Sequence, residues 1–201
     1  MTGIINYGAG NIFSVIVSVR NLHEDVIVVS KPEMLRNIDR IILPGVGAFD
    51  HAMKYLKETG LSDAIKEVAK KGKFLLGICL GLQMFFENSQ EGNLKGLQIL
   101  KGEVRKLPVR KNLPIPHMGW NTVNIIHNSR FLKGIPNESF FYFAHSFYCV
   151  PEERNNVVAL TSYGLEFASV IQKDNIIGVQ FHPEKSAKYG LRLIKNFLKM
   201  K

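Results

Sequence analysis

The sequence predicts an α/β fold with a mixed, mostly parallel central sheet flanked by helices. In the first half, short apolar runs alternate with amphipathic segments, as in successive β-α-β units. The continuous apolar run 74–78, between a helical stretch and a tight turn, is typical of a buried parallel strand. After Gly96 the chain becomes rich in β-branched and aromatic residues, which favour strands.

The first half predicts four strands, at 4–7, 26–29, 40–43 and 74–78. Helical periodicity predicts helices over 11–22, 49–59 and 61–71, and 82–88 is compatible with a further helix.

The second half predicts strands at 97–107, 120–126, 140–150, 157–163 and 167–179. An amphipathic helix over 186–201 ends the chain, with its apolar residues directed to the core: Leu191, Leu193, Ile194 and Phe197. No repeat, low-complexity tract or linker divides the sequence, so a single domain over 1–201 is expected.

Composition narrows the class of protein. The chain has 26 Lys and Arg against 17 acidic residues, but these basic residues are scattered, so nucleic-acid binding is not expected. Two cysteines are too few for a disulfide framework. No apolar run approaches the ~18 residues of a membrane span, and the N-terminus lacks the pattern of a signal peptide. We expect a cytoplasmic protein without membrane association, metal or cofactor.

Residues 77–81 form a Gly-x-Cys-x-Gly pattern between the apolar strand and a helix-compatible stretch. This is the cysteine form of a nucleophile elbow, in which glycines flank the nucleophile because the turn is sharp. The turn places the Cys79 sulfur at a helix N-terminus, which favours thiolate over thiol. A lone cysteine can also be a core residue, but strand, glycine, cysteine, glycine and helix in that order favour the nucleophile.

A nucleophilic cysteine needs a base, and the base usually needs a third group to orient it. His182 and Glu184 follow the predicted strand 176–180, and a period of two puts both on one side. The carboxylate would then hold one ring nitrogen while the other faces Cys79. A capped histidine or a two-ligand metal site are the alternatives, and no third ligand of comparable geometry supports the metal site.

The segment Leu43-Pro-Gly-Val-Gly-Ala-Phe49 follows the predicted strand 40–43. Attack on an amide creates an oxyanion, which backbone N–H donors stabilise. Val46 and Gly47 suit such an oxyanion hole, shared with the N–H of Leu80. By itself Pro-Gly-x-Gly is a common turn, and its position one strand-and-helix unit before the elbow gives it weight.

The motifs Gly-Ile-Cys-Leu-Gly-Leu-Gln (77–83) and Phe-His-Pro-Glu (181–184) resemble those of the class I, or triad, glutamine amidotransferases. Within that class, four further stretches resemble the glutaminase subunits of imidazole glycerol phosphate synthases in histidine biosynthesis. These stretches are Asn-Tyr-Gly-Ala-Gly-Asn (6–11), 43–49, Pro-His-Met-Gly-Trp-Asn (116–121) and Lys-Ser (185–186). The resemblance runs essentially from end to end and implies the flavodoxin-like fold of the class.

The resemblance implies that Cys79 attacks the glutamine amide, His182 shuttles the proton and Glu184 orients His182. It further implies a set of glutamine contacts: Gly47, Gln83, Glu91, His145, Ser146 and Phe147. Phe147 departs from the family, where tyrosine is common, and a backbone contact there would tolerate the change.

The resemblance also implies a heterodimer with a (β/α)8 barrel cyclase that receives the ammonia and makes imidazole glycerol phosphate and an aminoimidazole carboxamide ribotide. The positions that match the family's interface are Asn11, Ser14, Met118, Trp120 and Lys185. Released ammonia is mostly protonated in neutral water, so a sealed path to the partner is expected. Met118 and Trp120 would anchor the docking face if exposed, and core packing is the alternative.

Two other functions remain open at this point. A paralogous glutaminase with the same motifs could supply ammonia to a related barrel that amidinates a sugar. A non-catalytic or nucleic-acid-binding protein on the same fold is disfavoured by the complete Cys-His-Glu set.

Overall fold

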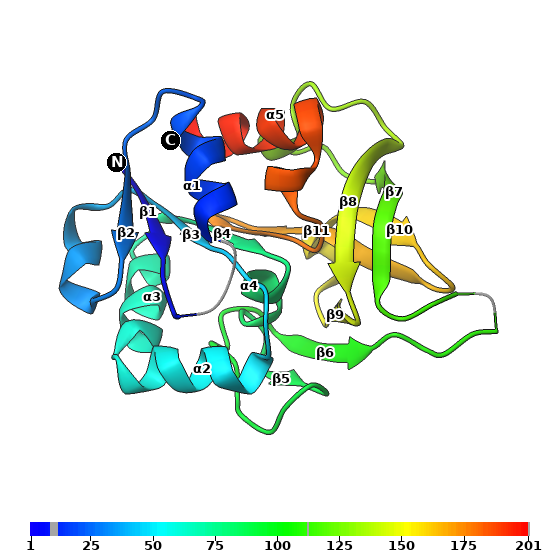
Figure 1. Cartoon of the computed structure of the whole chain (residues 1–201), viewed down its shortest axis with the longest axis horizontal. Helices are drawn as coiled ribbons and strands as arrows, with labels where there is room; N and C mark the ends of the chain where they lie inside the picture. The colour runs from blue at the N-terminus through cyan, green and yellow to red at the C-terminus, as the bar shows by residue number, and fades with distance from the viewer. Residues whose placement is uncertain (9–11, 112, 201) are drawn as a thin grey trace.

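The computed structural model describes residues 1–8, 12–111 and 113–200, which form two sheets with helices packed on both faces of the larger one (Figure 1). The nine-stranded sheet has the order β2-β1-β3-β4-β12-β11-β10-β7-β8, and the three-stranded sheet the order β5-β6-β9. The α/β class and the mixed central sheet are therefore confirmed.

The parallel part of the large sheet comes mainly from the first half of the chain. Its strands are β2 (Val26–Val29), β1 (Thr2–Ile5), β3 (Arg40–Leu43), β4 (Phe74–Ile78) and β12 (Ile176–Val179). Every neighbouring pair among them is parallel. These strands read as continuous apolar runs because helices cover both of their faces. The other four neighbouring pairs are antiparallel, so "mostly parallel" holds only for this part.

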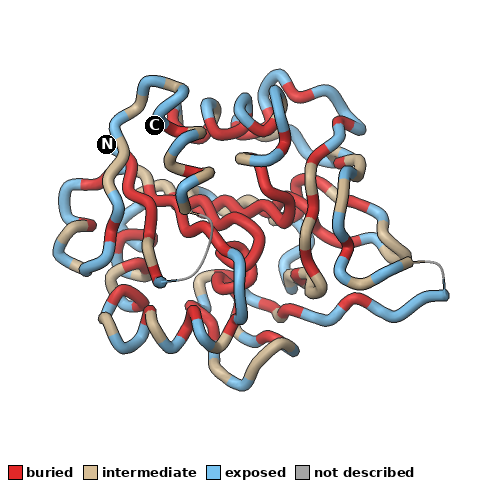
Figure 2. Tube along the Cα trace, in the orientation of Figure 1, coloured by how far each residue is buried: buried red, intermediate tan, exposed pale blue. Residues whose placement is uncertain are grey.

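The helices divide between the two faces of the parallel strands. On one side lie α1 (Ile12–Arg20) and α5 (Ala187–Leu198), and on the other α2 (Phe49–Glu58) and α3 (Leu61–Lys70). Ile4 joins the apolar cluster under α1 and α5, whereas its neighbour Ile5 joins the cluster under α2 and α3. This alternation gives the sheet two cores, which Figure 2 shows as buried strands between half-exposed helices.

The antiparallel part comes from the second half. It contains β11 (Glu166–Lys173), β10 (Val157–Ser162), β7 (His117–Ile125) and β8 (Ser139–His145). The small sheet holds β5 (Asn88–Ser89), β6 (Gly102–Lys106) and β9 (Phe147–Pro151). Short 3-10 helices fill connections: η1 (Pro32–Asn37), η2 (Arg130–Leu132), η3 (Arg154–Asn156) and η4 (Pro183–Lys185).

Several expected elements differ from the structure. The single strands expected at 140–150 and 167–179 are each two strands, since the chain changes sheet at Ser146 and reverses at Asp174, whose φ is 51°. The helix expected over 82–88 is instead the one-turn α4 (Leu80–Gln83), because the chain turns into β5. Leu191 is exposed rather than directed to the core. Apolar composition predicted strands but could not place these breaks.

Among the described residues, no helix is both long and apolar enough to cross a membrane.

Candidate active site

The candidate site lies where β3, β4 and β12 end. These strands are parallel neighbours, so their carboxyl ends meet at one edge of the sheet. The segments that leave this edge carry the three sequence motifs: Gly45 to Gly47 after β3, Cys79 after β4, and His182 with Glu184 after β12. Open α/β sheets bind ligands outside the carboxyl ends of their strands.

Cys79 occupies a strained turn between β4 and α4. Its φ of 52° and ψ of −108° are unusual for a residue with a Cβ. Its N–H donates to Val179 O at 2.8 Å, which ties the turn to β12. A Cβ at Gly81 would collide with the carbonyl oxygen of Leu43, and one at Gly77 with the Leu82 amide. The flanking glycines therefore permit the close packing that holds the cysteine in this conformation.

The elbow holds Cys79 without the help of a long helix. Because α4 has only four residues, amides close to the sulfur matter more here than a helix macrodipole. The Cys79 sulfur lies 3.6 Å from Gln180 Nε2, which donates to it, and 3.7 Å from the carbonyl oxygen of Ala144. Gln180 was not predicted as a site residue, although it stands two positions before His182.

His182 and Glu184 form a buried pair next to Cys79. His182 Nδ1 lies 2.9 Å from Glu184 Oε1, and the two side chains are only 2% and 4% exposed. Glu184 reaches the ring from the 3-10 turn η4, so a helical turn and not strand alternation brings the two together. Within the described chain, His182 Nε2 is buried without a hydrogen-bond partner. That nitrogen is therefore the one available to the Cys79 sulfur.

The electrostatics of the pair favour an imidazolium. Burial by itself lowers the pKa of His182, but the Cys79 sulfur and the Glu184 carboxylate outweigh burial and raise it to about 10. A protonated ring beside a sulfur stabilises the thiolate, the nucleophilic form of cysteine. By contrast, Cys149 is buried and burial raises the pKa of its thiol, which keeps it unreactive.

The backbone of His182 is clamped by Tyr142 and Ser186. The His182 N–H donates to Tyr142 O at 2.8 Å, while Ser186 Oγ donates to His182 O at 2.6 Å and accepts from the Tyr142 N–H at 3.0 Å. The sequence offered Ser186 only as part of a Lys-Ser motif, with no role. Its hydroxyl joins the end of β12 to β8 and fixes the position of the ring.

The segment after β3 lies against the elbow. A Cβ at Gly45 would overlap the Gly81 amide and the Leu80 side chain, so the two backbones touch there. This contact brings Val46 and Gly47, both exposed, to the side of Leu80. Gly47 has a φ of 113°, which favours glycine. The three expected oxyanion donors thus belong to neighbouring segments.

Tyr7 is bonded to the loop that follows β3, a contact that the sequence did not indicate. Its buried hydroxyl donates to Pro44 O at 2.9 Å. Burial raises the pKa of Tyr7, the Cys79 sulfur adds to the rise, and the Val46 backbone amide partly offsets it. The Tyr7 hydroxyl therefore lies within electrostatic reach of both the nucleophile and the oxyanion loop.

The expected glutamine contacts fall into two groups. Gly47 and Glu91 lie near the start of α2, where burial raises the pKa of Glu91, a hydrogen bond from the Phe49 amide lowers it and Asp50 raises it. Ser146 is half-buried at the point where the chain leaves β8 for β9. All three residues stand on loops.

The other three contacts are linked by hydrogen bonds. Gln83 Nε2 donates to Phe147 O at 2.9 Å and to Gln180 Oε1 at 3.3 Å. The His145 ring is buried, with Nδ1 2.8 Å from the same Phe147 oxygen. The His145 Nδ1 and the Gln83 amide nitrogen thus already bond to other groups of the protein. These bonds indicate that the two side chains shape the site and do not contact glutamine through these atoms.

Among the residues expected at a partner interface, Met118, Trp120 and Lys185 lie near one another on β7 and η4, and Asn11 is outside the described residues. Trp120 and Met118 are 52% and 64% exposed, so core packing is wrong for both. Trp120 contacts Tyr142 edge to face, and the exposed Lys185 lies 5.8 Å from the Tyr142 ring centre. Ser14 is half-buried in the first turn of α1.

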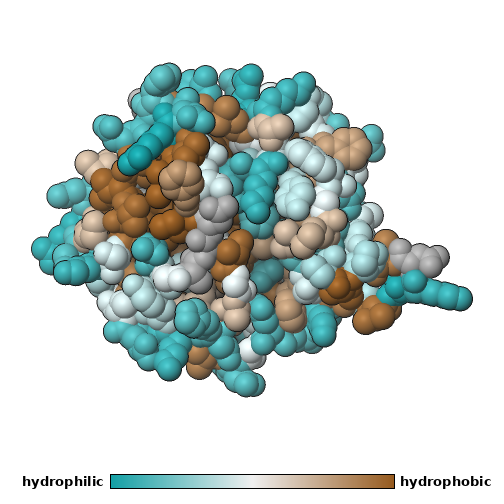
Figure 3. All heavy atoms as spheres, viewed as in Figure 1, coloured by the Kyte–Doolittle hydropathy of each residue, from teal (hydrophilic) through white to brown (hydrophobic). Residues whose placement is uncertain are grey.

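A separate apolar area lies over α1 and β2. It includes the exposed side chains of Phe13, Val17 and Val28, and apolar atoms gather there in Figure 3.

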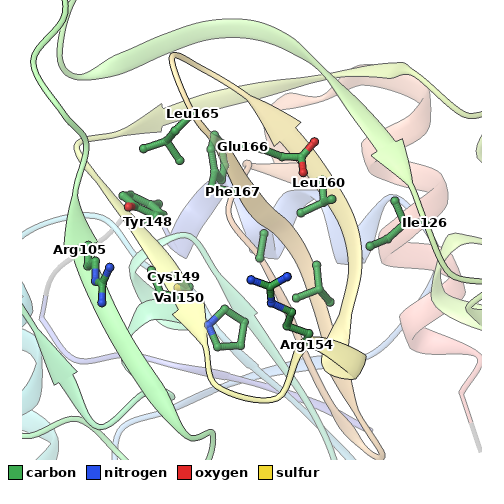
Figure 4. A pocket seen from close by; sticks show the side chains of 13 residues that line it. Arg105, Ile126, Tyr148, Cys149, Val150, Arg154, Leu160, Leu165, Glu166 and Phe167 are labelled. Atoms are coloured by element: carbon green, nitrogen blue, oxygen red, sulfur yellow. The ribbon is translucent and has the colours of Figure 1, made fainter.

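A groove of about 530 Å³ lies between β9 and β11, away from the triad (Figure 4). Tyr148, Cys149 and Phe167 line it together with Arg105 and Arg154, and its lining includes none of Cys79, His182 and Glu184. The one cysteine that lines this groove is Cys149, and burial raises the pKa of its thiol. We therefore assign the reacting site to Cys79 and not to this groove.

Known proteins resemble this chain over nearly its whole length. The family described as "Glutamine amidotransferase class-I" matches residues 3–200. The "Imidazole glycerol phosphate synthase subunit HisH" of Moorella thermoacetica is 49% identical, covering 96% of this chain and 92% of that protein. The protein of the same name from Caldanaerobacter subterraneus subsp. tengcongensis is 46% identical, covering 100% and 98%. "Imidazole glycerol phosphate synthase subunit HisH 2" of Methanococcus maripaludis is 42% identical, covering 99% of each.

Solved structures share the fold at low identity. A chain in the structure of PurLQS from Thermotoga maritima superposes with a TM-score of 0.79 at 17% identity, covering 98% of this chain and 96% of that one. A glutamine amidotransferase from the same organism gives a TM-score of 0.66 at 20% identity, covering 98% and 81%. The sequence matches go further than shared fold. They show that this chain belongs to the class-I glutamine amidotransferase family.

Proposed function

We propose that this chain is the glutaminase subunit of an imidazole glycerol phosphate synthase, which hydrolyses glutamine to glutamate and ammonia. The observation that carries the proposal is the strained Cys79 beside the buried His182–Glu184 pair, with 2.9 Å between Nδ1 and Oε1. The names of its relatives in Moorella thermoacetica and Caldanaerobacter subterraneus support this choice of enzyme within the family. We further propose that residues 1–201 act as one domain in the cytoplasm.

The first half-reaction forms a covalent intermediate. The Cys79 thiolate attacks the side-chain amide carbon of glutamine, and the carbonyl electron pair moves onto oxygen. The N–H groups of Val46 or Gly47 and of Leu80 would stabilise this oxyanion. The C–N bond then breaks, the nitrogen takes a proton from His182 and leaves as ammonia, and a thioester remains on the cysteine.

The second half-reaction frees the enzyme. His182, now neutral, removes a proton from water as the oxygen attacks the thioester carbon. Glutamate leaves, and the sulfur departs as the thiolate beside the reprotonated ring. Glu184 keeps a proton on Nδ1 throughout, because its carboxylate can only accept there. The ring therefore presents Nε2 for both transfers.

The glutamine site would combine loops from three parts of the chain. The pair Gly47 and Glu91 lies beside α2, and Ser146 with the Phe147 backbone lies beyond β8. A backbone role fits phenylalanine at 147, where a tyrosine hydroxyl is absent. Gln83 and His145 would shape the site through the Phe147 carbonyl, which both contact.

The ammonia would pass to a (β/α)8 barrel cyclase, whose lyase step belongs to that partner. Exposed Trp120 and Met118 supply the aromatic and apolar anchors that interface centres favour, and Lys185 supplies a neighbouring charge. Ser14 would extend this face from α1, and we propose Asn11, outside the described residues, as a further contact.

Reconstitution with a purified barrel tests the proposal. With glutamine, the wild-type complex should make imidazole glycerol phosphate, and Cys79→Ala should not. With added ammonium salt, both complexes should make it at similar rates, because the nucleophile serves only the first reaction. Glutamine-dependent turnover by Cys79→Ala would refute the triad. Product only with a sugar-amidinating barrel would refute the proposed partner.

A further inference from the structure

Two buried histidines lie next to each other beside the active site without belonging to the triad. His117 begins β7 and His145 ends β8, and the two are direct partners across the strands. Their side chains are almost completely buried, and His117 Nδ1 lies 3.0 Å from His145 Nε2. That distance corresponds to a hydrogen bond. A shared metal ion is not the explanation, because the described residues contain no group of three His, Cys, Asp or Glu side chains that could hold one.

The proton positions follow from groups at one end of the pair. Asn121 Oδ1 accepts from the Thr122 N–H at 2.8 Å, and Asn121 Nδ2 donates to Ser162 O at 3.0 Å, so the orientation of this amide is fixed. Nδ2 also lies 3.3 Å from His117 Nε2 and can only donate to it. His117 therefore carries its proton on Nδ1 and donates to His145.

The hydrogen bonds of His145 independently indicate the same direction for the bond between the two rings. His145 Nδ1 lies 2.8 Å from Phe147 O, and a carbonyl can only accept. His145 thus carries its proton on Nδ1 and leaves Nε2 free to accept from His117. Both rings are neutral in this arrangement, and burial agrees with it, since it lowers the pKa of His117 to about 4 and that of His145 to about 3.

The chain of bonds continues to the nucleophile. The Phe147 oxygen that accepts from His145 also accepts from Gln83 Nε2 at 2.9 Å. The same Gln83 nitrogen donates to Gln180 Oε1 at 3.3 Å. With its oxygen occupied, Gln180 must turn its Nε2 towards the Cys79 sulfur, 3.6 Å away. The donors therefore run from His117 to Phe147 O and from Gln83 to the sulfur, and Phe147 O accepts from both sides.

We propose that His117 and His145 are positioning residues for the glutaminase reaction, which hold the Gln180 amide on the Cys79 sulfur through a hydrogen-bond relay whose two halves meet at Phe147 O. The relay acts through Phe147 O and Gln83. The proposal depends on the proposed function only in taking Cys79 as the nucleophile. The two faces of β7 would then have different roles, since His117 and Asn121 are on the inner face and Met118 and Trp120 are exposed on the outer face.

A purely structural role for His117 is the alternative. Its ring stacks between Phe143 and Tyr163, with centroid distances of 4.7 and 3.9 Å, and an aromatic ring of any kind could fill that space. The two roles differ in what they demand of the ring nitrogens. Only the relay requires the Nδ1–H tautomer at both histidines.

The first measurement is nitrogen-15 NMR of the imidazole rings in the isolated wild-type protein. Two neutral histidines should carry their protons on Nδ1 between pH 5 and 8, with assignments made by their disappearance in His117→Phe and His145→Asn. This readout needs neither glutamine nor a partner, so its failure is distinct from failure of the proposed function. An Nε2–H tautomer or a charged ring at either position overturns the relay.

The second measurement is the alkylation rate of Cys79 by iodoacetamide, followed by mass spectrometry, alongside glutaminase kinetics. His117→Phe keeps the stack but removes the donor, so alkylation and kcat should fall together about fivefold, the effect of one hydrogen bond, with KM unchanged. His117→Asn, which keeps a donor near Nδ1, should recover most of the loss. Tyr163→Phe is the matched control, because it keeps the stack and loses a hydrogen bond to Pro114 O outside the relay.

Two outcomes of this experiment overturn the proposal. The first is wild-type alkylation in His117→Phe. The second is an equal loss in His117→Phe and Tyr163→Phe, which would assign the effect to packing. If His117→Phe fails to fold, His117→Asn assigns the His117 signal and the tautomers of the wild-type rings decide.

Discussion

Replacing Glu184 by glutamine tests how far the reactivity of Cys79 depends on a buried negative charge behind His182. The substitution keeps the size and shape of the side chain, and the amide oxygen can still accept from Nδ1. It removes the charge at a position only 4% exposed, where solvent screens little. The perturbation is therefore electrostatic, with little change in packing.

The magnitude follows from the change in hydrogen-bond type. A bond to a charged group contributes about 1.5–3 kcal/mol and a neutral one about 1 kcal/mol. The difference of about 0.5–2 kcal/mol corresponds to a loss of roughly 2- to 30-fold in kcat/KM. His182→Ala should lose far more, because it removes the base itself.

The pH dependence should change in a defined direction. Folding raises the pKa of His182 from 6.5 to about 10, with Cys79 and Glu184 outweighing the effect of burial. A raised pKa stabilises the folded protein fully below pH 6.5, and this contribution is lost as pH rises through about 10. Without the Glu184 charge the pKa of His182 falls. The alkaline limb of activity and the alkaline loss of stability should both move to lower pH.

The assay is initial-rate glutamate release by the complex from pH 6 to 10, with thermal unfolding at the same pH values. Glu103→Gln provides the matched control, because Glu103 pairs with Arg105 at the surface and an exposed pair contributes little. It should leave kcat/KM unchanged. If Glu184→Gln keeps wild-type kcat/KM and an unshifted alkaline limb, the carboxylate does not tune His182 and the reasoning is refuted.

Three further predictions concern the oxyanion loop and the elbow. Tyr7→Phe removes the hydroxyl that holds Pro44 O and should cost about 1 kcal/mol in urea unfolding and lower kcat, whereas an unchanged kcat would show that the loop does not need this anchor. Gly81→Ala should destabilise the protein by about 1–3 kcal/mol, since its methyl group would meet Leu43 O, and wild-type stability would contradict that contact. Partner binding should accelerate single-turnover acylation of Cys79 by roughly 10² to 10³ if it turns one loop N–H towards the oxyanion, and equal rates with and without the liganded barrel would exclude such gating.

Local sequence was sufficient for three of the five parallel strands and for the three motifs. Short apolar runs predicted 26–29, 40–43 and 74–78 with the bounds that the structure has. Breaks such as Ser146 were missed, since an aromatic run on both sides looks like one strand. The pairing of His182 with Glu184 was expected from strand alternation, whereas a 3-10 turn produces it.

By itself the sequence determined the α/β class, the elbow at Cys79 and the order of the three motifs, because these depend on neighbouring residues and on period. Only the tertiary structure decided which other residues contact these motifs. Gln180, Tyr7 and His117 come from separate parts of the chain. Their partners are the Cys79 sulfur, Pro44 O and the His145 ring, which lie too far away in the sequence for a local pattern to indicate them. The exposure of Trp120 was equally undetermined, since burial depends on what packs over a strand and not on the strand's own residues.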